Sequence, residues 1–537
     1  MVNNHIKNNR FTGNTLVYFN VGLVALVVAF LVIDNYILTD KLEMVAEKAI
    51  KPSTEVTETM NETVTDETKA VLHNSVAVLP FENLNPNPDD AYFAVGIHKE
   101  ILDNLAKIRD ITVIPGISVV RYQSSDNSIA EITAELNVAT LMKGSVRYSD
   151  DMVNIAVQLF DASGNNQLWS EQYDRELSDI FVIQAEIIEH IAMALGAEVS
   201  AAEQERIDKV PTRSLEAYVL YLKARTLMKT ISPLIPPEFY QILDQAIAID
   251  PDFALAHAFK ASGYGISKNI GYQLNGLTLD EMEIVTLEHI EKALAVDPTI
   301  GYAHMAQAFI HYSNRRGTET KQAFERALKL SPNDIEILDE YSRFLSAIEE
   351  HDEAIRLAQR VLELAPYAFS TYDLLGGALK GVGDVAGATD VYRQGIKIAP
   401  SYVGIRRNLG MMEMILGNDT EAIKQLRLAE PSSGESSLPF SMARIAYSYS
   451  RLGHQEDAVR LVNLIEAKIA DGRYVRPGDR ALSYLAIGEI DKAYNILDQN
   501  PNEGIMSLKE IKSNILNDPI LEQPRFVELR KRIGTLD

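Results

Sequence analysis

One 34-residue unit of this chain, residues 366–399, reads PYAFSTYDLLGGALKGVGDVAGATDVYRQGIKIA. The same spacing separates four prolines, namely Pro298, Pro332, Pro366 and Pro400. Small residues keep this register five residues and twenty-four residues before a proline position: Ala293, Ala327, Val361 and Gly395 in the first set, and Ala308, Ser342, Gly376 and Gly410 in the second. A fixed period of this length predicts helix–turn–helix units that bury their apolar faces against their neighbours, with small residues where two helices approach closely.

A second marker is a glycine followed five residues later by an alanine, at Gly383/Ala388, Gly417/Ala422, Gly453/Ala458 and Gly488/Ala493. The glycine permits the turn between two helices, and the alanine fits their crossing. The period and this marker are typical of the tetratricopeptide repeat (TPR). We therefore interpret residues 210–500 as about eight helical pairs of an all-α superhelical solenoid, and residues 501–537 as a C-terminal helical cap.

The spacing is broken once, between Pro251 and Pro298, where 47 residues stand in place of 34. Two glycines within residues 267–278 place the extra thirteen residues in the loop between the helices of that repeat. Since each repeat contacts only its neighbours, we expect residues 210–537 to fold alone as a helical particle.

Length and composition bound the function. A chain of 537 residues is too long for one core and is expected to hold several domains. It has no cysteine, which excludes disulfide and thiolate chemistry. Lys and Arg number 51 against 75 for Asp and Glu, a net charge of -24 that makes binding to nucleic acid unfavourable.

Residues 15–33 are almost wholly apolar, and no charged side chain occurs from Phe11 to Ile33. As a helix these residues span about 28 Å, close to the hydrocarbon thickness of a bilayer. We interpret the segment as an uncleaved transmembrane helix. A cleaved signal peptide is the alternative, but its apolar core is usually shorter, about 7–15 residues.

The charges flanking this span predict its orientation. Lys7 and Arg10 precede it, whereas Asp34 and Asp40 follow it. The positive-inside rule then places residues 1–14 in the cytoplasm and everything after Ile33 outside, with a single pass through the membrane.

Residues 34–74 follow as a linker rich in Thr and Glu that has no apolar face. Such a composition does not repay the entropy of ordering, so we expect a flexible tether. Its 34 residues after Asp40 would reach about 30–35 Å on a root-mean-square basis.

Residues 75–200 mix both patterns and predict a small α+β layer domain. A buried strand at 75–81 precedes a helix that starts at Asp89 and Asp90 and carries Phe93, Ile97, Ile101, Leu105 and Ile108 on one side. The segments that follow are a strand at 111–114, a helix at 128–136, a meander of strands at 138–148, 153–159 and 168–173, and a helix at 180–195. We expect one face of the sheet to be covered by other elements of the domain and the other face to be partly exposed to solvent.

Several stretches of this domain carry a resemblance: Ser75-Val-Ala-Val-Leu-Pro-Phe81, Tyr92-Phe-Ala-Val-Gly96, Gly144-Ser-Val-Arg147, Leu168-Trp-Ser-Glu-Gln-Tyr-Asp174 and Asp179-Ile-Phe-Val-Ile-Gln184. They resemble the TolB-like N-terminal module of bacterial membrane regulators, which follows a transmembrane helix and leads into TPR repeats. Residues 518–530 also resemble the tail of that group. The resemblance implies a protein of the bacterial inner membrane whose folded domains lie in the periplasm. Val95 and His98 stand where related modules usually carry Asp and Thr, so any binding by those polar groups is not expected here.

Relatives in that group commonly carry a cytoplasmic output domain before the span, either a class III adenylate cyclase or a winged-helix (CadC-like) domain. This sequence has about fourteen residues there, so we expect it to lack that output domain.

In TPR proteins the first helix of each pair lines the concave face, so the register assigns partner-binding positions. They are Tyr302, Phe309, Tyr312, Arg343, Arg407, Asn408, Met411, Arg444 and Tyr447. Because arginine binds carboxylates bidentately and tyrosine offers rigid contact area, these residues predict an acidic protein or peptide partner.

No motif for catalysis, for a cofactor or for a metal is present: the chain has no Walker loop, no G-x-S-x-G and no histidines at ligand spacing with carboxylates. We therefore predict a non-enzymatic scaffold or sensor with no small-molecule substrate. A second hypothesis makes it the receptor half of a split signalling system, with a separate adenylate cyclase or transcriptional regulator as its output.

Overall fold

The computed structural model describes residues 72–87, 90–123, 125–149, 151–228, 235–269, 272–430, 438–500 and 523–532, all within one compact unit. The predicted membrane helix at 15–33 and the linker up to residue 71 lie outside this range. So does most of the C-terminal segment, of which helix α24 (Pro524–Arg532) is described. In the described ranges, no helix combines the length and the apolar character needed to cross a membrane.

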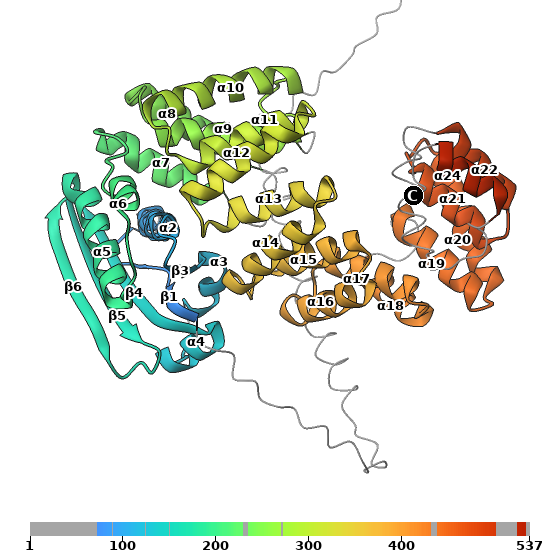
Figure 1. The fold of residues 1–537 in the computed structure, drawn as a ribbon, viewed down its shortest axis with the longest axis horizontal. Coiled ribbons are helices and arrows are strands. Elements are labelled where there is room, and N and C mark those ends of the chain that lie inside the picture. Colours follow the sequence, from blue (N-terminus) through green and yellow to red (C-terminus); the bar gives the residue numbers. More distant parts are fainter. Residues whose placement is uncertain are drawn as a thin grey trace, which may run out of the picture. The chain divides into compact units, whose positions relative to one another are not determined.

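A mixed sheet opens the described chain (Figure 1). Its strands run in the order β3-β1-β4-β5-β6, with bounds β1 (Leu72–Val78), β3 (Thr112–Ile114), β4 (Val138–Ser149), β5 (Met152–Asp161) and β6 (Gln167–Glu176). β1 is parallel to both β3 and β4, whereas β4, β5 and β6 form the antiparallel meander that the alternating sequence predicts. The two-residue β2 (Glu82–Asn83) pairs with Ser145 and Val146 of β4 and was not predicted.

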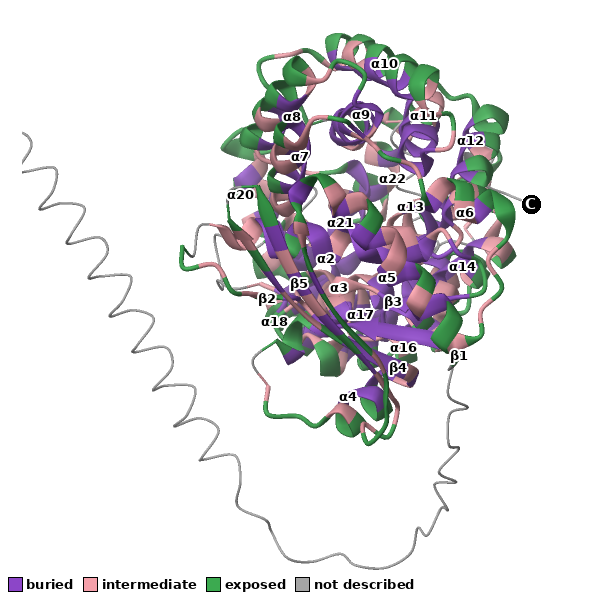
Figure 2. Cartoon of the chain, turned by 90° about the vertical axis from the view of Figure 1, so that its left-hand side faces the viewer, coloured by how far each residue is buried: buried purple, intermediate pink, exposed green. Residues whose placement is uncertain are grey.

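The burial of the strands follows their sequence pattern. β1 is buried from Ser75 to Val78, as its unbroken apolar run predicts (Figure 2). β5 buries Val153, Ile155, Val157 and Leu159 and leaves the residues between them partly or fully exposed. β6 is an edge strand that buries only Tyr173 among its ten residues.

Helices complete this layer, mostly at their predicted positions. They are α2 (Ala91–Ala106), α3 (Gly116–Val119), α4 (Ile129–Leu136), α5 (Ile180–Leu195) and α6 (Ala201–Ile207). Helices α2 and α5 share one apolar cluster with Val76 and Val78, and α3 and α4 share another with Ala77. α2 ends at Ala106, before the predicted Ile108, which is nevertheless fully buried in the following loop.

Eight helical pairs follow in the described residues. They are α7 (Leu215–Leu227) with α8 (Pro237–Ile249), α9 (Ala254–Asn269) with α10 (Leu279–Val296), α11 (Gly301–Ser313) with α12 (Gly317–Leu330), α13 (Ile335–Ala347) with α14 (His351–Leu364), α15 (Phe369–Val382) with α16 (Val385–Ile398), α17 (Val403–Ile415) with α18 (Asp419–Leu428), α19 (Pro439–Arg451) with α20 (Gln455–Ala470), and α21 (Pro477–Ala486) with α22 (Ile490–Gln499). The insertion falls in this second pair, α9 with α10, as predicted, but the loop between the two helices spans only residues 270–278. The rest of the thirteen extra residues lengthens the two helices, which have 16 and 18 residues against 13 and 14 in α11 and α12.

The repeat markers occupy their expected places. All four turn glycines of the second marker have positive φ, between 76° and 86°, and the four alanines that follow them are fully buried. At Gly410, an added Cβ would lie 2.7 Å from Cγ of Leu426, so the crossing of α17 and α18 has no room for a side chain. The same turn position in two earlier repeats holds Arg315 and Glu349, with φ of 58° and 65°.

The sheet layer and the first repeats share one continuous apolar core. Between α2 and α7, the guanidinium of Arg225 is ion-paired with Glu100 and with Asp103, and the hydroxyl of Tyr221 donates to Glu100. Further along, the side-chain amide of Asn333 donates to the carbonyls of Ile108 (3.0 Å) and Ile111 (2.8 Å). These contacts pack the first repeats against the sheet layer, and the folding of residues 210–537 alone stays a prediction.

Candidate peptide-binding cavity

A cavity of about 530 Å³ lies along the first helices of three consecutive repeats. Helices α11, α13 and α15 contribute most of its wall, and the register that sets their shared face also sets the cavity. Aromatic rings line it together with aliphatic and methionine side chains; the rings are those of Phe309, Tyr312, Phe324, Phe344, Phe369 and Tyr402. Its size and its apolar character are those of protein sites that accept a ligand or several side chains of a partner.

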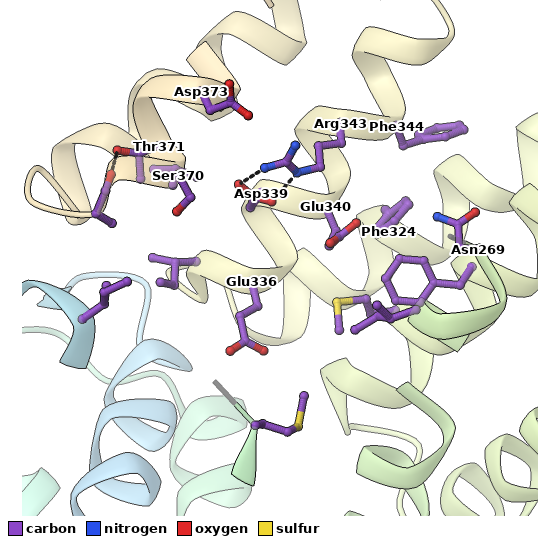
Figure 3. Close-up of a pocket in the computed structure, with 18 of the residues that line it drawn as sticks. Asn269, Phe324, Glu336, Asp339, Glu340, Arg343, Phe344, Ser370, Thr371 and Asp373 are labelled. Atoms are coloured by element: carbon purple, nitrogen blue, oxygen red, sulfur yellow. Dashed lines mark hydrogen bonds and ion pairs between the residues drawn. The ribbon is translucent and has the colours of Figure 1, made fainter. Parts of the chain in front are cut away.

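Helix α13 supplies the polar part of this wall. Glu336, Asp339, Glu340 and Arg343 follow one another at steps of three, one and three residues, which places them on one helix face (Figure 3). Asp373 joins them from α15. Four carboxylates therefore line the cavity against one guanidinium.

Two of the four carboxylates, Asp339 and Asp373, accept hydrogen bonds from arginine or asparagine side chains. Arg343 donates to Asp339 from Nε (2.7 Å) and from a terminal nitrogen (3.3 Å), and the amide of Asn408 donates to Asp373 (2.7 Å). Glu340 and Glu336 form no ion pair with any residue that the structure describes. Both are partly buried, so their charge is poorly solvated.

Burial in this wall shifts the titration of its carboxyl groups. It raises the pKa of Glu340 to about 7, and the neighbouring charge of Asp339 adds to the effect. Burial also raises the pKa of Glu336, with the charge of Asp103 as the next cause. Asp334, which caps the start of α13, has its pKa raised to about 7 by burial and by Glu336. Ionisation of these carboxyl groups is therefore less favourable in the folded protein than in water.

A second cavity, about 360 Å³, adjoins the first, and both are lined by Ile117 and Glu336. It reaches the sheet layer, where Val95 is exposed. His98 is buried there and hydrogen-bonded to the carbonyl of Val78 (2.9 Å), and burial lowers its pKa to about 4. Lys99 donates to the carbonyl of Arg225 (2.9 Å), so its amine already forms a hydrogen bond at the C-terminal end of α7.

Five of the nine predicted partner-binding residues lie at or beside these cavities. Phe309, Tyr312 and Arg343 line the larger one, and Tyr312 is 38% exposed. Tyr302 lines the second cavity but is only 8% exposed. Asn408 does not line the larger cavity and instead holds Asp373 on its wall.

The other four residues lie away from the cavity. Met411 and Tyr447 are buried in the core between helices. Arg444 is 1% exposed, donates to Asp479 (2.8 Å) and lies 3.4 Å over the ring of Phe440, which the partly buried Arg407 also approaches (5.4 Å). Arg407 and Arg444 are therefore neighbours, as predicted, but Arg444 is a core residue because a buried aspartate binds it.

These placements do not support the expectation of an acidic partner in the cavity. That expectation depended on three arginines, of which Arg343 is paired with Asp339 and Arg444 with Asp479. The carboxylates that face the cavity were not predicted, although two of them lie at positions set by the 34-residue spacing of the repeats. Glu336 lies one period after Tyr302, and Asp373 lies one period after Asp339.

No family model matches the chain. Over 249 residues, 46% of this chain and 42% of the relative, it is 32% identical to "Putative adenylate cyclase 3" of Rhizobium meliloti (strain 1021). Over 98 residues, 18% of this chain and 17% of the relative, it is 31% identical to the Hsp70-Hsp90 organizing protein of Triticum aestivum. It is also 28% identical over 87 residues to tetratricopeptide repeat protein 33 of Homo sapiens, covering 16% and 33% of the two chains. The chain spans less than half the length of each of these relatives.

Among solved structures, the chain is similar to one titled for pilF of Pseudomonas aeruginosa, with a TM-score of 0.34 and 15% identity over 44% of this chain and 98% of that one. A Cut9-Hcn1 heterotetramer structure gives a TM-score of 0.38 and 15% identity, covering 66% and 63%. TM-scores this low carry no argument about function. The helical pairs and their 34-residue register define a TPR-type solenoid that follows a small N-terminal sheet.

Proposed function

We propose that this chain is a non-enzymatic, membrane-anchored scaffold or sensor that binds an extended segment of a partner protein in its solenoid. The observation that carries the proposal is the cavity of about 530 Å³ on the first helices of consecutive repeats, with aromatic rings such as Phe309 and Phe344 beside polar groups. Rigid aromatic anchors next to a few placed polar groups are the usual composition of a peptide-binding surface.

The anchor in this proposal is the apolar run at residues 15–33, which the flanking charges orient with the N-terminus in the cytoplasm. The solenoid then works in the periplasm at the end of the linker. The sheet layer is the counterpart of the TolB-like module that its sequence resembles, and its contacts with α7 and Asn333 make it a fixed support for the repeats.

A receptor half of a split signalling system is the second candidate. The favouring observation is the match of 46% of this chain to a relative named for adenylate cyclase. In that case the output is a separate polypeptide, and the membrane helix must pair with a helix of that partner.

Cross-linking of the full-length chain in cells, followed by identification of the captured proteins, tests the proposed function. We expect one protein to be captured by a photoactivatable residue at Tyr312, at the exposed edge of the cavity, and not by one at Glu291, on the outer helix α10. Equal capture at both positions would contradict binding in the cavity.

Replacing residues 15–33 by an unrelated apolar helix separates the two candidates. A scaffold keeps its partner after this exchange, whereas a split receptor loses its output. An alkaline phosphatase fusion after Asn74 tests the orientation, and an inactive fusion would exclude a periplasmic solenoid.

A further inference from the structure

We propose that the partner segment carries a lysine or arginine whose cation binds at Glu336 and Glu340, one helical turn apart on α13. This inference rests on the proposed function, because it names the chemistry of the segment in the same cavity. The aromatic part of the cavity takes the apolar residues next to that cation.

The charge on the wall supports a cationic occupant. Four carboxylates and one guanidinium face the cavity, and the guanidinium of Arg343 already binds Asp339 through two hydrogen bonds. Glu336 and Glu340 have no ion pair within the described ranges, yet both are partly buried. Arg225, Lys99 and a hydrogen bond from Tyr302 only partly offset the effect of burial, which leaves the pKa of Glu336 raised. A cation placed between the two carboxylates would replace solvation that the cavity does not supply.

The surroundings favour an amino-acid side chain over a metal ion. Among the described residues, no group of three or more Asp, Glu, His or Cys side chains is arranged to hold a metal. Rings of Phe309, Phe344 and Phe369 line the same cavity, and a bare ion would leave them uncovered. A lysine or arginine on a peptide brings a cation together with apolar neighbours.

The net negative charge of the whole chain also favours a basic partner segment. With 75 acidic residues against 51 basic ones, it attracts a basic segment and repels an acidic one before contact.

A peptide array with the full-length chain, purified in a mild detergent, tests the proposal. Each nonapeptide is made in three versions with apolar flanks and Lys, Gln or Glu at its centre, and the strongest binders are titrated by fluorescence anisotropy. We expect the Lys version to bind about tenfold or more tightly than its Gln version and the Glu version to bind least.

The double variant Glu336→Gln with Glu340→Gln keeps the shape of both side chains and is expected to bring the Lys and Gln versions to within about twofold of each other. Its matched control is Glu291→Gln with Glu319→Gln, which removes the same charge from exposed positions on α10 and α12 and should leave the preference intact. Circular dichroism confirms that both variants are folded.

Three outcomes overturn the inference in different ways. If the three versions bind equally well and binding is lost in Tyr312→Ala, the cavity binds peptides but not through a cation. If no version binds, the peptide-binding function fails and the inference with it. An equal loss of preference in the control variant would assign the effect to overall charge and would also overturn the site.

Discussion

Arg225 on α7 and Glu100 on α2 form an ion pair although 125 residues separate them, and their side chains are only 7% and 8% exposed. Asp103 shares the guanidinium, and Tyr221 donates to Glu100. This pair joins the sheet layer to the first repeat within a continuous apolar core. A buried pair of this kind costs much more when one partner is removed than it contributes as a pair.

Arg225→Ala should therefore destabilise the protein by about 3–5 kcal/mol, because it leaves a buried carboxylate without its cation. Urea denaturation followed by circular dichroism measures the loss. Arg356→Ala is the control, since Arg356 pairs with Glu353 on an exposed part of α14 and should change stability by less than about 0.5 kcal/mol. Equal effects of the two variants would contradict the role given to Arg225.

Removal of residues 72–209 should leave a helical but less stable solenoid. The deletion exposes Tyr218, Tyr221 and Leu222 of α7, all fully or almost fully buried, and such an apolar face binds hydrophobic dyes and promotes association. Thermal melting and dye binding of the fragment, compared with those of the chain from residue 72, measure this effect. The same melting temperature for both, without dye binding, would show that the repeats are independent.

Arg444→Ala should destabilise the protein by about 1.5–3 kcal/mol, because the buried Asp479 loses one of its two cations and keeps Arg476. Arg407 lies over the same ring of Phe440 but is only partly buried, so Arg407→Ala should cost about 1 kcal/mol or less. Urea denaturation of the two variants compares them directly. Similar losses would mean that Arg444 is not held as a core residue.

The turn between α11 and α12 offers a stabilising change. Arg315 has φ of 58° at the position where later repeats have glycine, and a residue with a Cβ is strained there by about 1–2 kcal/mol. Arg315→Gly should raise the free energy of unfolding by about 0.5–1 kcal/mol, since glycine relieves the strain but costs chain entropy. The reverse change at the matching position, Gly417→Ala, should lower it, and stabilisation by both changes would refute the argument.

The acidic wall predicts a pH dependence of stability. The pKa of Glu340 is raised to about 7 by burial and by Asp339, while Arg343 opposes the shift and Glu336 adds to it. A carboxyl with a raised pKa contributes stability that is present below its ordinary pKa and is lost as the pH rises through about 7.

Glu340→Gln should accordingly be more stable than the natural chain at about pH 8, by about 1–2 kcal/mol, and no more stable at about pH 4. Urea titrations at the two pH values measure the difference, with Glu291→Gln as the control at an exposed position. A difference between Glu340→Gln and the natural chain that does not change with pH would contradict the charge assigned to this wall.

Features set by local periodicity could be predicted from the sequence. Gly383 and Gly417 adopt the left-handed turn because one residue type suits that backbone, and Gly410 packs against Leu426 because the period fixes where helices cross. The alternating residues of β5 were predicted for the same reason, since each side chain points to the face that its polarity requires.

Long-range contacts could not be predicted in this way. The bonds from Asn333 to Ile108 and Ile111 join residues more than 220 positions apart, and no spacing in the sequence records them. The charge of the cavity was missed for another reason. Its acidic residues lie on the predicted first helices, but a first helix carries core and cavity residues together, and only the structure separates Arg444 from Glu340.

The contact of α2 with α7 determines where this solenoid can change length. A stack of repeats exposes an apolar face at each end unless something covers it, and here the sheet layer covers the face of the first pair. Among the described residues, bonds to that layer include those of Arg225, Asn333 and Tyr367, whose hydroxyl donates to the carbonyl of Glu135. A second copy of residues 366–399 placed at Pro400 would displace α17 and the later helices by one unit while these bonds remained, so the array can be lengthened by duplication towards its C-terminal end.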